Sequence, residues 1–169
     1  MTVSMHSASV PVLKQMLGSL DALLAKMQAH ATEKKVDPAV FLQARLSPDM
    51  FALSRQVQIA CDFARGLAAR LAEVPVPGNE DKEQSVAELS ALIGRTLAFL
   101  DSLTPEQFAD SATRIIVIRP GTPKERSFSG QQYLFSYGLP QFFFHVTTAY
   151  ALLRHNGVEV GKRDYMGAY

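Results

Sequence analysis

The chain has 169 residues, of which 47% are hydrophobic and 20% charged, a composition and length that fit one globular domain with a full core. The 17 basic and 16 acidic residues nearly balance, so no global positive field attracts nucleic acid or an anionic membrane surface. No stretch approaches the ~20 apolar residues of a membrane span. The single cysteine, Cys61, excludes an internal disulfide and lies in an apolar stretch, where we expect a buried, unreactive side chain. These features predict one cytoplasmic domain over residues 1–169, with no nucleic-acid and no membrane partner.

Three segments carry apolar residues at three- and four-residue steps, the spacing of amphipathic helices. The three ranges are about 9–30, 48–71 and 86–100. Between the first two, Asp37-Pro38 and Ser47-Pro48 each place an N-cap residue before proline at the first helical position, so a short helix is expected before the second long one. Prolines, glycine and acidic residues over residues 73–85 are typical of a loop.

The pattern changes at residues 113–129, where a β-branched run, a Pro-Gly turn and a second short run predict a two-stranded hairpin. Because an isolated hairpin is marginally stable, it should lie against the helices. A fourth helix is expected from about Pro140 to the C-cap signal Asn156-Gly157, with the remaining tail docked on the bundle. The predicted fold class is therefore all-α, a four-helix bundle with a small β-hairpin insertion before the last helix.

Two polar side chains are expected to face the bundle interior. His145 lies at the edge of the apolar arc of the fourth helix, and Gln56 lies within that of the second, whereas Arg55, Gln58 and Asp62 fall on the other side of the second helix. Because an unpaired buried amide costs on the order of 1–3 kcal/mol, His145 is a plausible partner of Gln56 across the bundle. Two interpretations remain open: a satisfied core pair that fixes helix register, or polar groups that line a ligand pocket.

For the second interpretation, the predicted ligand-binding residues are His145, Gln56 and Tyr150, around a cavity between the second and fourth helices. A helical metal pair needs ligands three or four residues apart, but positions 148 and 149 are Thr148 and Ala149. The other three histidines lie elsewhere in the sequence. We therefore expect no metal and no other cofactor, and we identify no catalytic residue.

Two long motifs, SPDMFALSRQVQIACDFARG and LPQFFFHVTTAYALLRHNGVEVGKRDYMG, flank the Pro-Gly hairpin and resemble an uncharacterised domain family found in bacteria and fungi. The resemblance covers nearly the whole chain. That family is similar in fold to the DinB/YfiT-like superfamily of four-helix bundles, a group of suspected metalloenzymes, several of which form dimers. The resemblance implies a bundle of the up-down-down-up type and a homodimer.

DinB-like metal sites draw one histidine from the second helix and a His-x-x-x-His pair from the fourth. By resemblance His145 matches the first member of that pair, but Ala149 replaces the second member, and the second helix contains no histidine. Three functions remain open, because function belongs to sites and not to folds. They are a metal-free binding or regulatory protein with a small-molecule ligand, a metal-dependent hydrolase or thiol transferase that uses His145 with a carboxylate such as Asp49 or Asp62, and a protein that mainly forms a homodimer.

Overall fold

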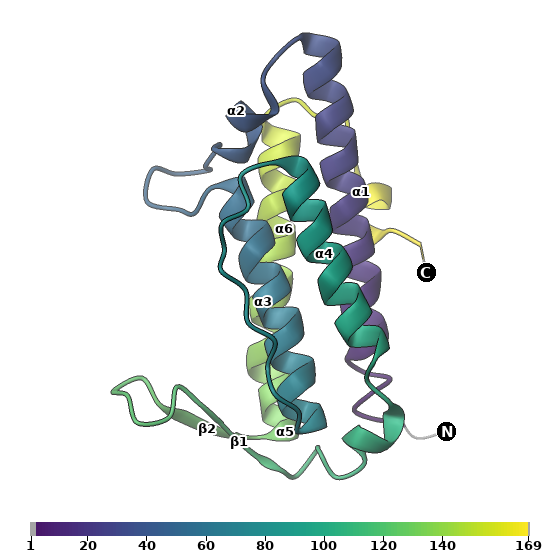
Figure 1. Cartoon of the computed structure of the whole chain (residues 1–169), viewed down its shortest axis with the longest axis vertical. Helices are drawn as coiled ribbons and strands as arrows, with labels where there is room; N and C mark the ends of the chain where they lie inside the picture. The colour runs from purple at the N-terminus through teal and green to yellow at the C-terminus, as the bar shows by residue number, and fades with distance from the viewer. Residues whose placement is uncertain (1–2, 169) are drawn as a thin grey trace.

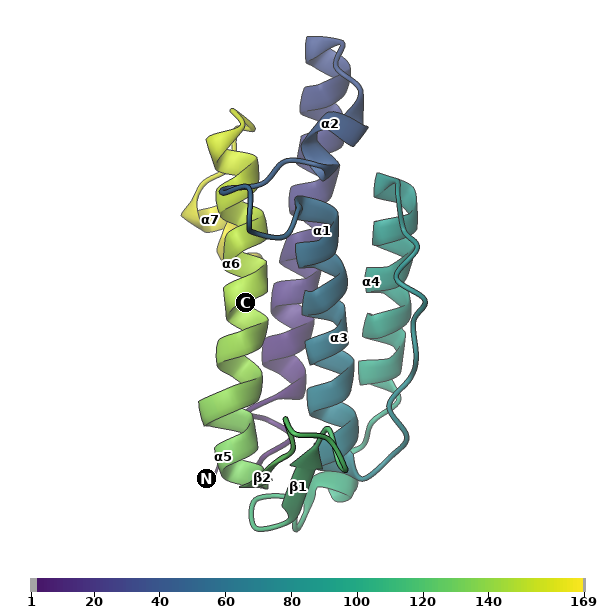
Figure 2. The same ribbon diagram turned by 90° about the vertical axis from the view of Figure 1, so that its left-hand side faces the viewer.

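Four long helices lie side by side along the molecule (Figures 1 and 2). The computed structural model describes residues 3–168, and its long helices are α1 (Val10–Lys34), α3 (Leu53–Ala72), α4 (Val86–Asp101) and α6 (Leu139–His155). Helices α1 and α6 run in one direction and α3 and α4 in the other, because the loop of residues 73–85, which connects α3 to α4, returns along the length of α3 (Figure 1). The structure confirms the predicted up-down-down-up four-helix bundle.

Helix α3 is the central element, in contact with α1, α4 and α6. Its buried apolar side chains recur at helical spacing and include Leu53, Val57, Ala60, Ala64, Leu67 and Leu71. Full burial of one leucine or valine side chain stabilises a fold by about 1.5–3 kcal/mol, so this stripe anchors the core. The predicted apolar stripe of the second long helix is confirmed.

Side-chain caps fix two of the helix starts. The carboxylate of Asp37 accepts a hydrogen bond of 2.9 Å from the Ala39 N–H and caps the short helix α2 (Pro38–Leu42), as its sequence predicts. At the start of α4, the Ser85 hydroxyl accepts from the Glu88 N–H at 3.2 Å, and the Glu88 carboxylate accepts from the Ser85 N–H at 2.9 Å. This capping box ends the loop that precedes α4.

The second long helix begins at Leu53, five residues later than the predicted start at Pro48. The Ser-Pro pair instead opens a turn, in which the Met50 N–H donates to the Ser47 carbonyl at 3.0 Å. The Arg45 guanidinium holds the turn by donating to the Met50 carbonyl at 2.6 Å. Serine followed by proline starts a β-turn as readily as a helix, so the local sequence does not separate the two.

The predicted hairpin is present as antiparallel strands β1 (Ile115–Ile118) and β2 (Arg126–Ser129), at one end of the bundle (Figure 2). Ile116 and Ile118 are buried, so one face of β1 packs on the helices. Directly after β2, the Gly130 N–H donates to the Arg114 carbonyl at 2.8 Å. A Cβ at Gly130 would lie 1.7 Å from the Ser111 carbonyl oxygen, so only glycine fits there.

Helical backbone before α6 begins well ahead of the predicted start at Pro140. A short helix α5 (Gly130–Gln132) leads into η2 (Tyr133–Gly138), a segment with π-helical hydrogen bonding, and α6 follows without a break. Pro140 lies in the first turn of α6, and because η2 precedes it without a break, its missing N–H removes one hydrogen bond from a continuous helical backbone. A π-segment inside a helix is frequent at functional sites.

The C-terminal tail docks on α1, as expected. Helix α7 (Lys162–Met166) contacts α1, and the Ser19 hydroxyl donates to the Tyr165 carbonyl at 2.7 Å. Lys26 of α1 pairs with the Asp164 carboxylate at 2.7 Å. Within residues 3–168, no helix combines the length and apolar character needed to cross a bilayer.

Replacing Gly130 by alanine should destabilise the protein. The new methyl group meets the Ser111 backbone, which cannot move without breaking the chain path into the hairpin, and overpacking of this kind costs about 1–3 kcal/mol. Gly94 is the matched control, because it is exposed on α4 and a Cβ added there would meet open space, so alanine should stabilise by up to about 1 kcal/mol. Urea unfolding of both variants measures the difference, and equal stabilities would contradict the close approach.

Candidate functional site

Gln56 of α3 and His145 of α6 meet inside the bundle. Gln56 is 1% exposed and His145 7% exposed, and the Gln56 Oε1 lies 2.7 Å from the His145 Nδ1. The Gln56 Nε2 donates to the Phe51 carbonyl at 3.1 Å. A carbonyl oxygen only accepts, so this bond orients the amide and assigns the proton to His145 Nδ1. The pairing predicted across the bundle is present.

The surroundings of His145 keep its imidazole neutral. Its ring stacks on Phe63 at a centroid distance of 5.8 Å and meets Phe144 edge-on at 5.2 Å. Burial lowers the pKa of His145 to about 4, and the nearby Arg55 guanidinium adds to this effect. With Nδ1 donating to Gln56, Nε2 keeps its lone pair and has no hydrogen-bond partner among residues 3–168.

The metal that DinB-like folds imply needs more ligands than this pair supplies. A histidine whose Nδ1–H donates to a carbonyl oxygen is oriented as metal ligands usually are, so His145 alone would suit one coordination position. However, residues 3–168 contain no group of three His, Cys, Asp or Glu side chains that could hold an ion. The Asp62 carboxylate instead pairs with Arg65, and that of Asp49 accepts from Ser47. The residues present do not fit a bound metal.

Tyr150 lies apart from this pair, contrary to its grouping with Gln56 and His145. Five residues along a helix correspond to a rotation of about 140°, so Tyr150 projects from another side of α6 than His145. Its ring packs edge-on against Tyr165 of α7 at a centroid distance of 5.6 Å. The structure therefore assigns Tyr150 to the contact with the docked tail.

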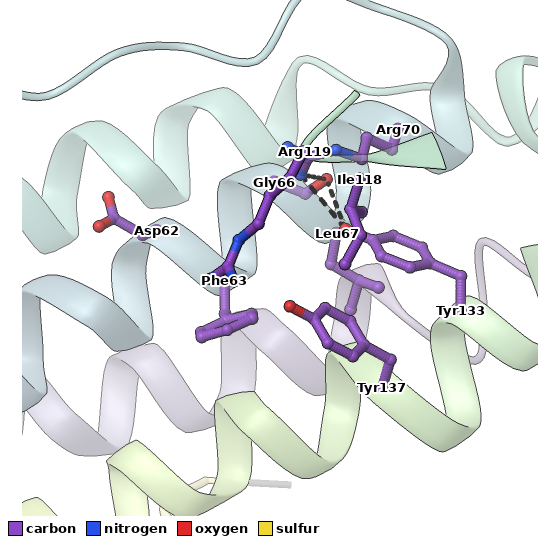
Figure 3. A pocket seen from close by; sticks show the side chains of 9 residues that line it. All are labelled: Asp62, Phe63, Gly66, Leu67, Arg70, Ile118, Arg119, Tyr133 and Tyr137. Carbon is purple, nitrogen blue, oxygen red and sulfur yellow. Dashed lines mark hydrogen bonds between the residues drawn. The ribbon is translucent and has the colours of Figure 1, made fainter. Parts of the chain in front are cut away.

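A pocket of about 200 Å³ lies between α3, β1 and η2, almost two helical turns along α3 from Gln56 (Figure 3). Its lining residues come from these three elements and the turn after β1: Asp62, Phe63, Gly66, Leu67, Arg70, Ile118, Arg119, Tyr133 and Tyr137. No residue of α6 lines it, whereas the expected cavity lies between the second and fourth helices. Neither Gln56 nor His145 lines it, so a ligand cavity beside these two residues stays a prediction.

Two glycines make room for the inner wall of the pocket. The Arg70 Nη1 donates to the Gly66 carbonyl at 2.9 Å and to the Tyr133 hydroxyl at 3.2 Å, and a Cβ at Gly66 would lie 2.5 Å from that nitrogen. On the facing segment, a Cβ at Gly138 would lie 2.3 Å from Leu67 Cδ1. Burial raises the pKa of Tyr133, so its hydroxyl stays protonated beside Arg70.

A series of aromatic rings connects the buried pair to the pocket. Phe63 lies between His145 and Tyr137, with ring centroids 5.8 Å and 6.1 Å away. Tyr137 in turn stacks on Tyr133 at 5.8 Å and lies 5.3 Å from Phe128 of β2. Through Phe63, the Gln56–His145 hydrogen bond helps to hold one wall of the pocket in place.

The pocket carries more unpaired positive than negative charge. Neither Arg70 nor Arg119 forms an ion pair with a carboxylate of residues 3–168. Asp62, the acid of the pocket, is paired with the buried Arg65. Burial raises the pKa of Asp62, and repulsion from the Asp81 carboxylate adds to the shift.

The chain matches the family described as "Domain of unknown function (DUF1993)" over residues 5–166. It belongs to this family. Among solved structures, the crystal structure of a DinB family member from Shewanella denitrificans is 41% identical and superposes with a TM-score of 0.91, over 97% of this chain and 92% of that chain. No match was found among curated proteins. Both the family and the DinB-like fold implied by the resemblance are thus confirmed.

In this DUF1993 domain, part of the face of α3 predicted to be polar is also buried. The loop of residues 73–85 covers it: the Gln58 Nε2 donates to Glu83 at 3.0 Å, and Arg55 pairs with Asp81 at 2.6 Å. Gln58 and Arg65 are both 5% exposed. The sequence places Gln58 outside the apolar arc but does not predict its burial, and the opposite charges of this face and of the loop were the signal that the two meet.

Cys61 is fully buried, as its apolar surroundings predict. Burial raises the pKa of its thiol to about 12, so it stays protonated at neutral pH. A thiol of this kind reacts poorly, because the thiolate is the nucleophile.

The buried His145 should make stability depend on pH. Its folded pKa of about 4 lies below the ordinary 6.5, so the unfolded chain binds the extra proton first, and the stability present above pH 6.5 is lost as the pH falls toward 4. Between pH 6.5 and 5 the loss should be about 1–2 kcal/mol. Urea unfolding as a function of pH tests this, with a His145→Phe variant as the control that lacks the titrating group. An equal pH slope in both proteins would refute the assignment.

Proposed function

We propose that this DUF1993 domain is a metal-independent binding protein that holds a small molecule in the pocket between α3, β1 and η2. The observation that carries the proposal is a pocket with largely apolar walls and two polar groups that are not engaged by other described residues. The Arg119 side chain has no ion-pair partner, and the Tyr137 hydroxyl no hydrogen-bond partner, among residues 3–168. Small-molecule sites combine apolar walls with a few such groups.

The Gln56–His145 pair has a supporting role in this proposal. It joins α3 to α6 with a buried hydrogen bond and stacks on Phe63, which is shared with the pocket. The predicted ligand-binding role of these two residues thus becomes an indirect one, through the position of the Phe63 ring. Tyr150 has no part in it.

A metal-dependent hydrolase or thiol transferase is the alternative that the superfamily suggests. The orientation of His145 Nε2 favours it, but residues 3–168 place no set of companion ligands for such an ion around it. The alternative would require ligands from outside these residues, because a catalytic zinc site usually has three protein ligands.

Zinc should therefore bind substoichiometrically. Elemental analysis of the protein purified without chelators, and calorimetric titration with zinc, should give the same low metal content for the native chain and for a His145→Ala variant. A stoichiometric ion that disappears in the His145→Ala variant would overturn the metal-independent proposal and favour the enzyme.

The predicted homodimer and cytoplasmic location stay predictions. Several large apolar side chains that such an interface could bury are exposed, namely Val40, Phe51, Phe135 and Phe144. Phe144 also flanks His145, so an interface there would close the outer side of the buried pair. A dimer is compatible with the binding role, because none of these four residues lines the pocket.

Ligand binding at the pocket can be tested with a mixed panel of small fragments: anionic, neutral and cationic. In ¹H–¹⁵N spectra, we expect at least one fragment to shift the amide signals of the lining residues Phe63, Gly66 and Tyr137. A Tyr137→Phe variant should weaken that binding with little change in stability, because the hydroxyl makes no internal bond, and Tyr150→Phe is the matched control. If no fragment of any class shifts the pocket signals at millimolar concentration, the proposal is refuted.

A further inference from the structure

The basic side chains around the pocket extend onto its outer face. A second, larger hollow of about 920 Å³ shares Ile118, Arg119 and Tyr137 with the pocket and continues along the hairpin. It adds Lys124 and Arg126, and neither has an ion-pair partner among residues 3–168. Cations that line connected hollows raise the local concentration of anions.

The acids in the same region are already engaged. Asp62 is paired with Arg65, and the Glu125 carboxylate accepts a hydrogen bond of 2.6 Å from the Gly121 N–H inside the hairpin turn. Arg119, in contrast, stands at the boundary of the two hollows with its guanidinium unpaired. Its backbone is fixed by the turn, since the Thr122 hydroxyl donates to the Arg119 carbonyl at 2.9 Å. The region therefore offers an exposed cation on a fixed backbone, and no carboxylate of residues 3–168 pairs with it.

The apolar inner walls of the pocket determine which uncharged group an anionic ligand could carry. Phe63, Tyr133 and Tyr137 present ring surfaces, and Leu67 and Ile118 complete an apolar wall. A cavity of about 150 Å³ holds a benzene ring, so 200 Å³ suits one ring with one substituent. Figure 3 shows the Tyr137 hydroxyl directed toward α3, where it can donate to an acceptor on the ligand.

We propose that the pocket binds a small aromatic carboxylate, with its ring against Phe63 and Leu67 and its carboxylate between the Arg119 guanidinium and the Tyr137 hydroxyl. This inference rests on the proposed function and specifies its ligand class. Guanidinium and hydroxyl donors match the two oxygens of a carboxylate, and bonds to a charged group are the stronger ones. A bare inorganic anion would leave the aromatic walls unused.

Three probes of nearly equal shape and different charge test the ligand class: benzoate, benzamide and benzamidine. Titrations followed by ¹H–¹⁵N spectra should show benzoate binding at the pocket, benzamide binding several-fold more weakly, and benzamidine not binding there. Benzoate binding should also weaken as salt is added, because the pairing is partly exposed to solvent.

The charge of Arg119 is tested by substitution. Arg119→Gln should weaken the binding of benzoate about fivefold or more. Arg119→Lys should retain part of the affinity. Arg154→Gln is the matched control, an exposed arginine on α6 that lines neither hollow. Thermal unfolding of each variant establishes that it folds. If Arg119→Gln does not fold, Tyr137→Phe tests the other proposed donor to the same carboxylate.

The outcomes separate this inference from the proposed function. If benzamide binds the pocket as tightly as benzoate and Arg119→Gln has no effect, the carboxylate is excluded, while a pocket that binds small molecules stands. If benzoate leaves the pocket signals unchanged but another fragment of the panel shifts them, the ligand class is wrong and the site is right. If no fragment of any charge binds there, both are wrong.

Discussion

The extensive burial of α3 is the constraint from which the rest of the structure follows. From Leu53 to Ala72 no residue is exposed, because α1, α4, α6 and the loop of residues 73–85 surround the helix. Each polar residue on α3 must therefore find a partner or cost free energy. Gln56 pairs with His145, Gln58 with Glu83, and Arg65 with Asp62. These pairs attach α6 and the loop to α3 at defined positions, which apolar packing alone does less specifically.

The same constraint explains how a DinB-like fold can persist without the ligands for a metal. At the contact between α3 and α6, a buried imidazole needs its N–H satisfied, and the Gln56 amide does this within the chain. Burial then holds the ring neutral, and Ala149 one turn further adds no second ligand. A hydrogen bond and an aromatic stack thus join the two helices at this contact without a metal ligand set.

Local sequence predicted the helices and the hairpin because their signals are local. Apolar spacing and the Asp37 cap depend on neighbours a few residues away, and both predictions were right. The burial of Gln58 was missed because it depends on Glu83, 25 residues later in the chain, in a loop whose path the helix pattern does not contain. The helix start predicted at Ser47-Pro48 was wrong for another reason, because the same residue pair also starts a turn. Within the candidate site, only the Gln56–His145 contact was predicted, because complementary polar groups on two apolar faces have few other partners.

The pocket escaped prediction because its three walls become neighbours only in the folded chain. The hairpin contributes Ile118 and Arg119, but its two strands cannot persist alone, so these residues are positioned only when β1 packs on the bundle. That packing depends on Gly130, where the chain passes against the Ser111 backbone, and on Gly138, where η2 approaches Leu67. The glycines look like ordinary turn residues in the sequence. In the fold they are the points at which hairpin, π-segment and α3 come close enough to enclose a site, so the geometry of the pocket and the docking of the hairpin are one structural property.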